Sequence, residues 1–400
     1  GCMTTRYSAT PPARVSASNR RLSMRSMQWA RTLARRVTAR PLRALSVFIG
    51  AAAAAVLAAF LLTLPFVHLH APPASFLVVD RRDSLLADIG FDADSGFGYW
   101  PMPVLPPRVA AATLALEDRR FWSHPGVDPA AIVRALRQNW RNDRRISGAS
   151  TIAMQVVRLQ QPAARTYLSK LKEAWLALAL TARYGREAVL AHYLRIAPYA
   201  NRAHGIAYAA QRYLSKPVED LSWAEIAFLS AIPQAPSKMN PFRAPGRSRV
   251  IERGQRILTV LHDNGVITPT ELTLARAQLA QLDVSAPRPR PDGALHALLQ
   301  LERVVTQQRA ALVAQGRFVL TTTLDLHLQR TIEDIANRSL TLWEAKGADN
   351  AAVIVLERGR NAVRAWIGSR GYFADAHGGA IDFTPVKRSP GSVLKPFIYA

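Results

Sequence analysis

A run of 24 residues without a charged side chain, ALSVFIGAAAAAVLAAFLLTLPFV at 44–67, constrains this chain more than any other feature. A helix needs about 20 apolar residues to cross the ~30 Å hydrocarbon core of a bilayer. A cleaved secretory signal has a shorter apolar core, of about 7–15 residues, and a small-x-small cleavage site. Neither is evident here. We therefore expect a retained transmembrane helix, against the alternative of a buried, alanine-rich core helix.

The charges on either side of this run predict its orientation. Residues 1–43 hold ten arginines and no lysine, aspartate or glutamate, so they carry ten of the formal net charge of +24 and leave +14 for the rest. Positive residues favour the cytoplasmic side of a membrane helix. We expect a basic cytoplasmic arm at 1–43 and everything after His68 outside. The basic body suits phosphates of lipid headgroups or of a pyrophosphate substrate, while export argues against nucleic acid as a partner.

Changes in composition and in hydrophobic pattern along the remaining chain predict its domains. Residues 68–106 are rich in proline, with short apolar runs such as SFLVV, and read as a connector with a strand or two. A strongly helical pattern fills 107–282, and the proline-rich SAPRPRPDG marks a linker at 283–295. A further domain is expected over 296–400. The single cysteine, Cys2, excludes an intrachain disulfide and a cysteine-based zinc site.

Local signals predict particular elements within these domains. Asp128-Pro129 reads as the start of a helix, and Ser222-Trp223-Ala224-Glu225 and Thr268-Pro269-Thr270-Glu271 read as capping boxes that open two more. A helix is expected after Asp325. The two β-branched runs of NAAVIVLERGRNAVRAWIGS, at 350–369, predict a β-hairpin.

The first candidate for chemistry is EDRRFWSHPG, which begins at Glu117. A carboxyl group that precedes aromatic residues and follows an apolar run could be partly desolvated, as general acid–base catalysis often requires. Taken alone, the same residues are more often a salt-bridged helix end, and a histidine such as His124 is more often a structural hydrogen-bonding residue. The segment does not decide between these readings by itself.

Two further segments carry polar groups suited to oxyanions. In SGASTIAMQVVR, at 147–158, Gly148 leaves the backbone open for substrate, and Ser150 and Thr151 offer hydroxyls and amides at an expected helix start. Gln155 and Arg158 follow on the same helical face. In KLKEAW, Lys170, Lys172 and Glu173 place basic groups beside a second acid, where they could neutralise a departing pyrophosphate. Ordinary helix caps remain the alternative for both segments.

These segments, together with REAVLAHYL at 186–194 and LSAIPQAPSKMNP at 229–241, resemble the five motifs of the family 51 peptidoglycan glycosyltransferases in order and spacing. SPGSVLKPFIYA, at 389–400, resembles the opening Ser-x-x-Lys motif of penicillin-binding transpeptidases. The combination is similar to class A penicillin-binding proteins, nearest those of the 1C type. The resemblance implies a mainly α fold: an N-terminal transmembrane helix, a lysozyme-like helical glycosyltransferase domain, and the partial start of an α/β transpeptidase domain.

The resemblance also implies roles for individual residues. Glu117 would be the general base that takes the proton of the acceptor sugar's 4-hydroxyl, with inversion at the anomeric carbon. Glu173 would be the second acid, which assists at the pyrophosphate, with Lys170 and Arg158 on the phosphates. Ser392 and Lys395 would be the transpeptidase nucleophile and its partner. The cleft would be shaped by Asp118, Phe121, His124, Gly126, Ser150, Thr151 and Gln155.

The implied partners are lipid II, the nascent glycan strand, the lipid bilayer and cell-wall synthesis proteins, at the inner membrane of a bacterium. A divalent cation, Mg²⁺ or Mn²⁺, is expected at most at the pyrophosphate, since no metal-ligand cluster is visible in the sequence. Two other classes remain open. A glycoside hydrolase would also use two carboxylates, and a non-catalytic scaffold would fit the departures from the family pattern.

Those departures affect the third and fourth motifs and the C-terminal segment. Ser169 replaces the first residue of a usual basic pair, Arg195 stands where asparagine is usual, and Ala200 occupies a position that is commonly glycine. Five residues follow Lys395, so the downstream S-x-N and K-T-G elements are absent from the sequence. We therefore expect no acylation at Ser392 in this chain.

Overall fold

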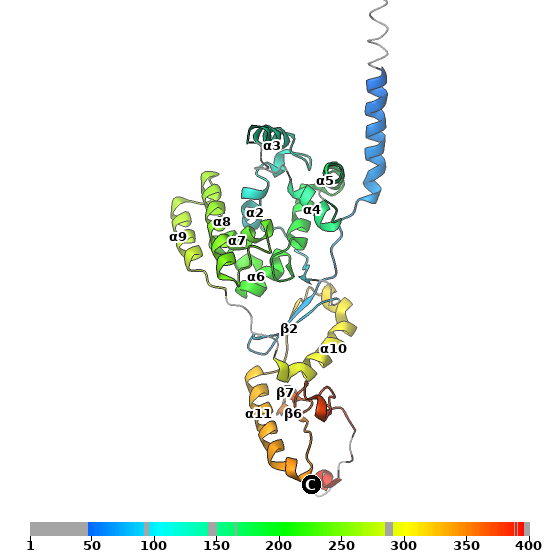
Figure 1. Cartoon of the computed structure of the whole chain (residues 1–400), viewed down its shortest axis with the longest axis vertical. Coiled ribbons are helices and arrows are strands. Elements are labelled where there is room, and N and C mark those ends of the chain that lie inside the picture. Colours follow the sequence, from blue (N-terminus) through cyan, green and yellow to red (C-terminus); the bar gives the residue numbers. More distant parts are fainter. Residues whose placement is uncertain are drawn as a thin grey trace, which may run out of the picture. The chain divides into compact units, whose positions relative to one another are not determined.

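The described residues divide into two units, one that ends at Phe66 and one that begins at Val67. In the first unit, Val47–Phe66 is a helix of 20 residues with a mean hydropathy of 2.5, long and apolar enough to cross a membrane (Figure 1). It lies within the run that the sequence predicts to span the bilayer. The computed structural model describes residues 47–91, 96–142, 150–164, 166–284, 291–387, 389 and 391–395.

A group of helices packed around α7 (Trp223–Ala231) makes up one part of the second unit. Every residue of α7 from Ala224 to Ala231 is buried, and the helix begins at the capping box that Ser222 forms with Glu225, as the sequence predicts. Helix α9 (Pro269–Gln281) begins at the predicted capping box of Thr268. Around α7 lie α2 (Pro107–Glu117), α8 (Ala244–Asp263) and α9 (Pro269–Gln281) (Figure 1).

Helices α4 (Ile152–Gln160) and α5 (Tyr167–Ile196) pack against each other and carry most of the remaining polar residues of interest. Gly185 interrupts α5 with φ +80° and ψ 164°, a conformation that a residue with a Cβ rarely adopts. The break divides α5 into two helical segments that meet at a kink at Gly185. Helix α3 (Pro129–Asn142) begins after Asp128, whose carboxylate accepts a bond from the Ala131 amide at 3.1 Å.

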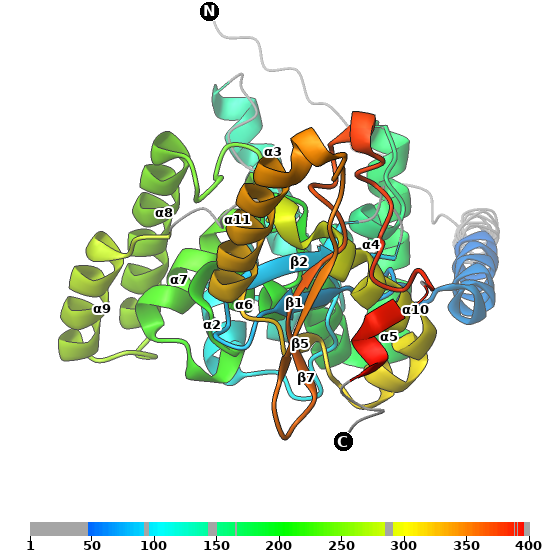
Figure 2. The ribbon, with the colours of Figure 1, turned by 90° about the horizontal axis from the view of Figure 1, so that it is seen from below.

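The connector after the apolar helix supplies the central strand of a three-stranded sheet. Strand β1 (Phe76–Val79) pairs antiparallel with β2 (Leu85–Ile89) and parallel with β5 (Val319–Thr321), as Figure 2 shows. All four residues of β1 are buried, which is the usual state of a central strand covered on both faces. The connector is therefore part of a hydrophobic core that it shares with the C-terminal region.

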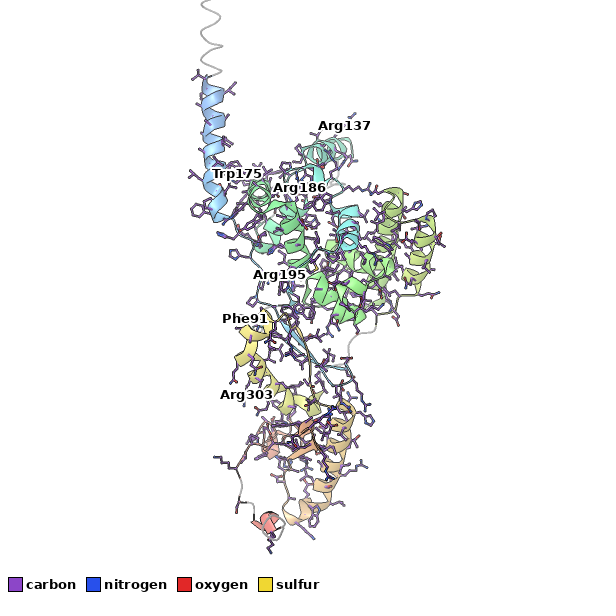
Figure 3. All side chains as sticks on the ribbon, turned by 180° about the vertical axis from the view of Figure 1, so that it is seen from behind. Phe91, Arg137, Trp175, Arg186, Arg195 and Arg303 are labelled. Carbon is purple, nitrogen blue, oxygen red and sulfur yellow. The ribbon has the colours of Figure 1, made fainter. Side chains whose placement is uncertain are left out.

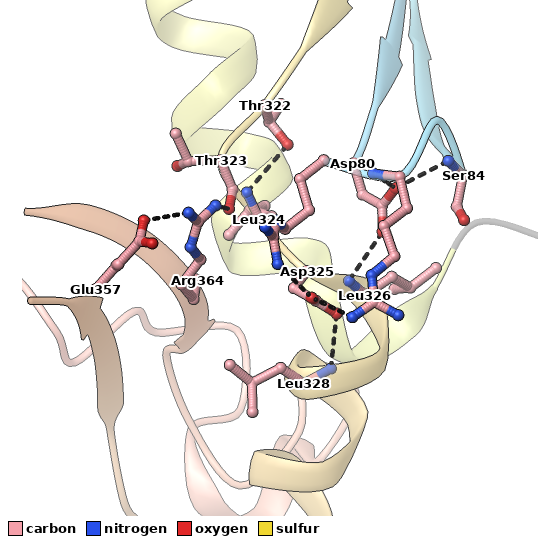
Figure 4. Close-up of polar contacts among 12 residues, drawn as sticks. Asp80, Ser84, Thr322, Thr323, Leu324, Asp325, Leu326, Leu328, Glu357 and Arg364 are labelled. Carbon is pink, nitrogen blue, oxygen red and sulfur yellow. Dashed lines mark hydrogen bonds and ion pairs between the residues drawn. The ribbon is translucent and has the colours of Figure 1, made fainter. Parts of the chain in front are cut away.

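Two buried aspartates fix the end of β1 to the C-terminal region (Figure 4). Asp80 Oδ1 accepts from the Ser84 amide at 2.8 Å, and its Oδ2 accepts from the Leu326 amide at 3.1 Å. Asp325 pairs with Arg81 at 3.4 Å. Because buried carboxylates are costly unless they are paired, these contacts hold the connector firmly against the start of α11 (Leu326–Trp343).

The C-terminal region contains the elements that its local sequence predicts. Asp325 caps α11 (Leu326–Trp343), and β6 (Val353–Glu357) forms an antiparallel hairpin with β7 (Ala362–Ile367). The mainly helical fold class, with few strands, is confirmed. The other elements are β3 (Phe97–Gly98), β4 (Ala203–His204), α6 (Ile206–Leu214), α10 (Leu295–Ala314) and the 3-10 turns Leu64–Phe66, Phe121–Ser123, Val218–Asp220, Ile232–Gln234, Asp292–Ala294, Glu344–Lys346, Asp375–His377 and Gly391–Leu394.

Candidate active site

Glu117 is the last residue of α2, and side chains from two distant segments bind both of its carboxylate oxygens. Arg253 of α8 donates from Nη2 to Oε1 at 2.6 Å, and Gln155 of α4 donates from Nε2 to Oε2 at 3.1 Å. The Arg253 and Glu117 side chains are 13% and 14% exposed. A helix C-terminus is unfavourable for an anion, and burial adds a desolvation cost. The hydrogen bonds from Arg253 and Gln155 offset these two costs. A charged group kept at a position that stability alone does not favour is typical of functional sites.

Tyr193 of α5 fixes the orientation of the Gln155 amide. Its hydroxyl donates to Gln155 Oε1 at 3.4 Å, so Nε2 faces Glu117. Burial, reinforced by the negative charge of Glu117, raises the pKa of the Tyr193 hydroxyl well above its ordinary value. The phenol therefore keeps its proton at any working pH. Tyr193, Gln155 and Glu117 form a continuous hydrogen-bonded row across three helices.

Asp118 joins the Glu117 segment to the start of α4. Its Oδ2 accepts from the backbone amide of Ile152 at 3.0 Å, and its Oδ1 lies 2.9 Å from His124 Nε2. The Gly126 amide donates to His124 Nδ1 at 3.2 Å, so the ring proton sits on Nε2 and His124 donates to Asp118. Both side chains are buried. Asp118 and His124 thus position their neighbours within the fold.

Gly126 lies where no side chain fits. Its φ is +114°, and an added Cβ would lie 2.6 Å from both the Ala177 carbonyl oxygen and Thr181 Oγ1 of α5. The Gly126 carbonyl accepts from the Thr151 hydroxyl at 2.6 Å. Thr151 also caps α4 through the Met154 amide. The segment after Glu117 is therefore held against both α4 and α5, and Gly126 makes this close approach possible.

A second polar cluster lies at the beginnings of α4 and α5. Lys170 Nζ donates to Ser150 Oγ and to Glu173 Oε2, each at 2.9 Å. Its side chain is 48% exposed, whereas that of Glu173 is 13% exposed. An ammonium and a hydroxyl beside a helix N-terminus are suited to bind an anion such as phosphate. The structure therefore brings together Ser150, Lys170 and Glu173, from two of the predicted segments.

The other predicted site residues are placed individually. Phe121 is buried against Trp122 and His124, with ring centroids 5.0 and 6.1 Å away. Arg158 lies exposed in the last turn of α4. Ser392 and Lys395 are exposed at the turn Gly391–Leu394, and no hydrogen bond joins their side chains in the described part of the chain. Gly148 lies outside the described residues.

The departures in the third and fourth motifs have structural consequences. Ser169 takes part in the start of α5, where its amide donates to Thr166 Oγ1 at 3.1 Å. Arg195 projects from the second half of α5 (Figure 3) and donates from Nε to the Tyr99 carbonyl at 2.9 Å. Ala200 adopts φ +63°, the first of three consecutive left-handed residues. The alanine at this commonly glycine position therefore has a strained backbone.

Each of the two candidate acids is bound by a basic side chain, Glu117 by Arg253 and Glu173 by Lys170. Mg²⁺ and Mn²⁺ prefer oxygen ligands, and Glu173 already accepts a bond from the Lys170 ammonium. Among the described residues, no group of three or more His, Cys, Asp or Glu side chains could hold a metal ion. A divalent cation at the pyrophosphate stays a prediction.

Sequence reasoning missed Arg253, the strongest partner of Glu117. The two residues are 136 positions apart, on helices that pack together only in the folded chain. No motif within RVIERGQR singles out Arg253 among its neighbouring arginines. Tyr193 lies inside the fourth motif segment, but only its distance to Gln155 shows what it does.

Comparisons with known proteins match the part of the chain that contains both polar clusters. Residues 89–262 match the transglycosylase family. The chain is 35% identical over 314 residues to penicillin-binding protein 1C of Escherichia coli, across 77% of this chain and 38% of that protein. It is 33% identical over 270 residues to penicillin-binding protein 1A of Aquifex aeolicus, across 67% and 36%. The chain thus spans less than half the length of these relatives.

A crystal structure of penicillin-binding protein 1A from Haemophilus influenzae aligns over 82% of this chain and 52% of that chain, at 14% identity. Its TM-score of 0.37 is too low to support an argument about the fold.

Proposed function

We propose that the chain, which matches the transglycosylase family over residues 89–262, is a membrane-anchored peptidoglycan glycosyltransferase. The observation that carries the proposal is that Arg253 and Gln155 each bind one oxygen of Glu117, a largely buried carboxylate at a helix C-terminus. An ordinary surface salt bridge contributes little to stability and needs no such support. A carboxylate that must accept a proton from a substrate needs a fixed position.

The proposed reaction joins two sugars of lipid-linked precursors. Glu117 takes the proton of the acceptor's 4-hydroxyl as that oxygen attacks the anomeric carbon of the donor. The bond from the anomeric carbon to the lipid pyrophosphate breaks on the opposite face, so the configuration inverts to a β-1,4 link. The substrate would be lipid II, and the product a growing glycan strand.

The Ser150, Lys170 and Glu173 cluster supports a pyrophosphate leaving group. The Lys170 ammonium, fixed by Glu173, would neutralise the charge that develops on the departing phosphate. Arg158 would add a second positive charge from the end of α4. Hydrolysis of a neutral glycosidic bond does not require such a cluster, which favours transfer from a pyrophosphate over glycoside hydrolysis.

The apolar helix Val47–Phe66 would anchor the enzyme in the bacterial inner membrane, where the polyprenyl tail of lipid II also lies. We propose that the basic arm is cytoplasmic and that the catalytic region is periplasmic. We further propose that residues 296–395 form the first part of a transpeptidase fold, with Ser392 and Lys395 at its Ser-x-x-Lys position.

One experiment separates polymerisation from hydrolysis. The full chain in detergent is incubated with fluorescent lipid II in one reaction and with finished peptidoglycan in another. We expect polymer that lysozyme digests from the first reaction, and no release of fragments from the second. Fragments from peptidoglycan without polymer from lipid II would show a hydrolase. The absence of turnover on both substrates would favour a scaffold.

A further inference from the structure

The two oxygens of Glu117 are bound by donors of different strength. Arg253 holds Oε1 through a charge-assisted bond of 2.6 Å, whereas a neutral amide of Gln155 holds Oε2 at 3.1 Å. Both bonds end on a carboxylate, but only the Arg253 guanidinium adds the attraction of an opposite charge, and its bond is the shorter of the two. An incoming hydroxyl that competes for Glu117 would therefore displace Gln155 more easily than Arg253.

Arg253 is firmly placed by the packing of α8. The next residue, Gly254, lies so close to α7 and α9 that an added Cβ would be 3.0 Å from Leu279 Cδ2 and 3.4 Å from the Ala227 carbonyl oxygen. This approach fixes the backbone from which the Arg253 side chain reaches Glu117. The pair Arg256–Glu252 on the same helix is more than 60% exposed on both sides. Arg253 therefore differs from an ordinary surface arginine in burial and in partner.

We infer that Arg253 is a positioning residue, which keeps Glu117 Oε1 bound throughout turnover and leaves Oε2 to take the substrate proton. This inference rests on the proposed function. In the step, the acceptor O–H bond breaks, its proton forms a bond to Oε2, and the freed oxygen bonds to the anomeric carbon while the pyrophosphate leaves. Loss of the proton from Oε2 to water then restores the bond from Gln155.

The Tyr193 contact makes the exchange at Oε2 reversible. Gln155 stays tethered through its Oε1 to the buried Tyr193 hydroxyl, even when its Nε2 no longer contacts Glu117. The amide is thus kept ready to return without a search over side-chain conformations. Arg253 provides the fixed contact of the carboxylate and Gln155 the exchangeable one.

The test measures lipid II polymerisation by the full chain in detergent for wild type, Arg253→Ala, Arg253→Lys and the control Arg256→Ala. We expect Arg253→Ala to lower kcat about 100-fold while KM changes less than about threefold, because only positioning in the transition state is lost. Arg253→Lys keeps the positive charge but not the planar guanidinium, and its kcat is expected to fall about tenfold. Arg256→Ala should behave like wild type.

Added guanidinium distinguishes positioning from general structural damage. At about 50 mM, far below denaturing concentrations, guanidinium should restore part of the kcat of Arg253→Ala, whereas urea and NaCl at the same concentration should not. Thermal melting of each variant reports folding. Should Arg253→Ala fail to fold, Arg253→Lys carries the test through its lowered kcat at unchanged KM.

A wild-type kcat in Arg253→Ala, or a folded Arg253→Lys with a wild-type kcat, would overturn the inference and leave the proposed function standing. A loss that appears only in KM would overturn it as well, since it would place Arg253 in substrate binding. If wild type itself makes no polymer, the proposed function fails and the inference fails with it.

Discussion

The carboxylate of Asp118 accepts a hydrogen bond from the backbone amide of Ile152 at 3.0 Å, and this contact ties the end of α2 to the first turn of α4. Because Glu117 immediately precedes Asp118, and Gln155 lies one turn beyond Ile152, the same contact sets the distance between the carboxylate and its amide partner. The buried His124 ring holds the other oxygen of Asp118 at 2.9 Å. Asp118 is therefore a buried contact that supports the geometry of the site.

Removal of this aspartate should destabilise the protein. Asp118→Ala leaves the Ile152 amide and the His124 ring without a buried partner, at an expected cost of about 2–4 kcal/mol in the free energy of unfolding. Asp118→Asn keeps one acceptor oxygen and should cost roughly half as much. Urea unfolding followed by circular dichroism measures both. A change below about 0.5 kcal/mol in Asp118→Ala would show that the contact contributes nothing.

Replacing the strained alanine should stabilise the protein. Ala200 has φ +63°, and a left-handed conformation costs a residue with a Cβ roughly 1–2 kcal/mol, part of which glycine gives back through its freedom in the unfolded chain. Ala200→Gly should therefore raise the free energy of unfolding by about 0.5–1 kcal/mol. The control Ala207→Gly, inside α6, should lower it by a similar amount. Destabilisation by both substitutions would contradict the assignment of strain to Ala200.

Acid should destabilise the protein through His192. Burial, together with the charge of Arg195, lowers the pKa of His192 to about 4. The unfolded chain, with its histidine near 6.5, therefore binds the proton more readily than the folded chain, and stability falls as the pH falls from about 6.5 to about 4. At pH 5 the loss due to His192 is about 2 kcal/mol.

Chemical denaturation at pH 7 and pH 5 measures this dependence. His192→Gln keeps a donor for the His70 carbonyl, which His192 Nε2 contacts at 3.1 Å, but cannot take up a proton in this range. The variant should lose about 2 kcal/mol less than wild type between the two pH values. Equal losses in both proteins would show that His192 does not titrate as its burial requires.

The Lys170 ammonium in the cluster with Ser150 and Glu173 should promote departure of the leaving group and contribute little to the free energy of unfolding. Lys170→Ala is expected to lower kcat for lipid II polymerisation about 100-fold, because the developing pyrophosphate charge loses its nearest ammonium. Lys170 is half-exposed, so its removal should change the free energy of unfolding by less than about 1 kcal/mol. Lys346→Ala, which removes an exposed lysine of the C-terminal region, serves as the control. A wild-type rate in Lys170→Ala would remove Lys170 from the mechanism.

Short-range features of the fold could be predicted from the sequence because their causes are local. Ser222 and Thr268 form capping boxes, and Asp325 caps α11, since each interaction lies within one turn of a helix. The hairpin of β6 and β7 follows from two apolar runs around a short turn. The resemblance to known motifs assigned these segments to one catalytic region through their order along the chain. Local patterns alone do not provide that assignment.

Long-range partners could not be predicted in this way. The parallel pairing of β1 with β5 joins residues more than two hundred positions apart. Neither short strand carries a sequence signal that identifies its partner. Arg253 is likewise one of several arginines on α8, and only the packing of α8 directs it to Glu117. The prediction that Asp118 and His124 shape a cleft stays a prediction; the structure adds that both are buried and contact each other, which the sequence alone does not show.

The most direct test compares wild type with Glu117→Gln in continuous polymerisation of fluorescent lipid II by the full chain, with thermal melts of both proteins. The glutamine keeps an oxygen that can accept from Arg253, but it cannot take the acceptor's proton. We predict glycan polymer from wild type, a rate at least about 1,000-fold lower from Glu117→Gln, and folded protein in both cases. Equal rates of polymerisation by the two proteins would contradict the account.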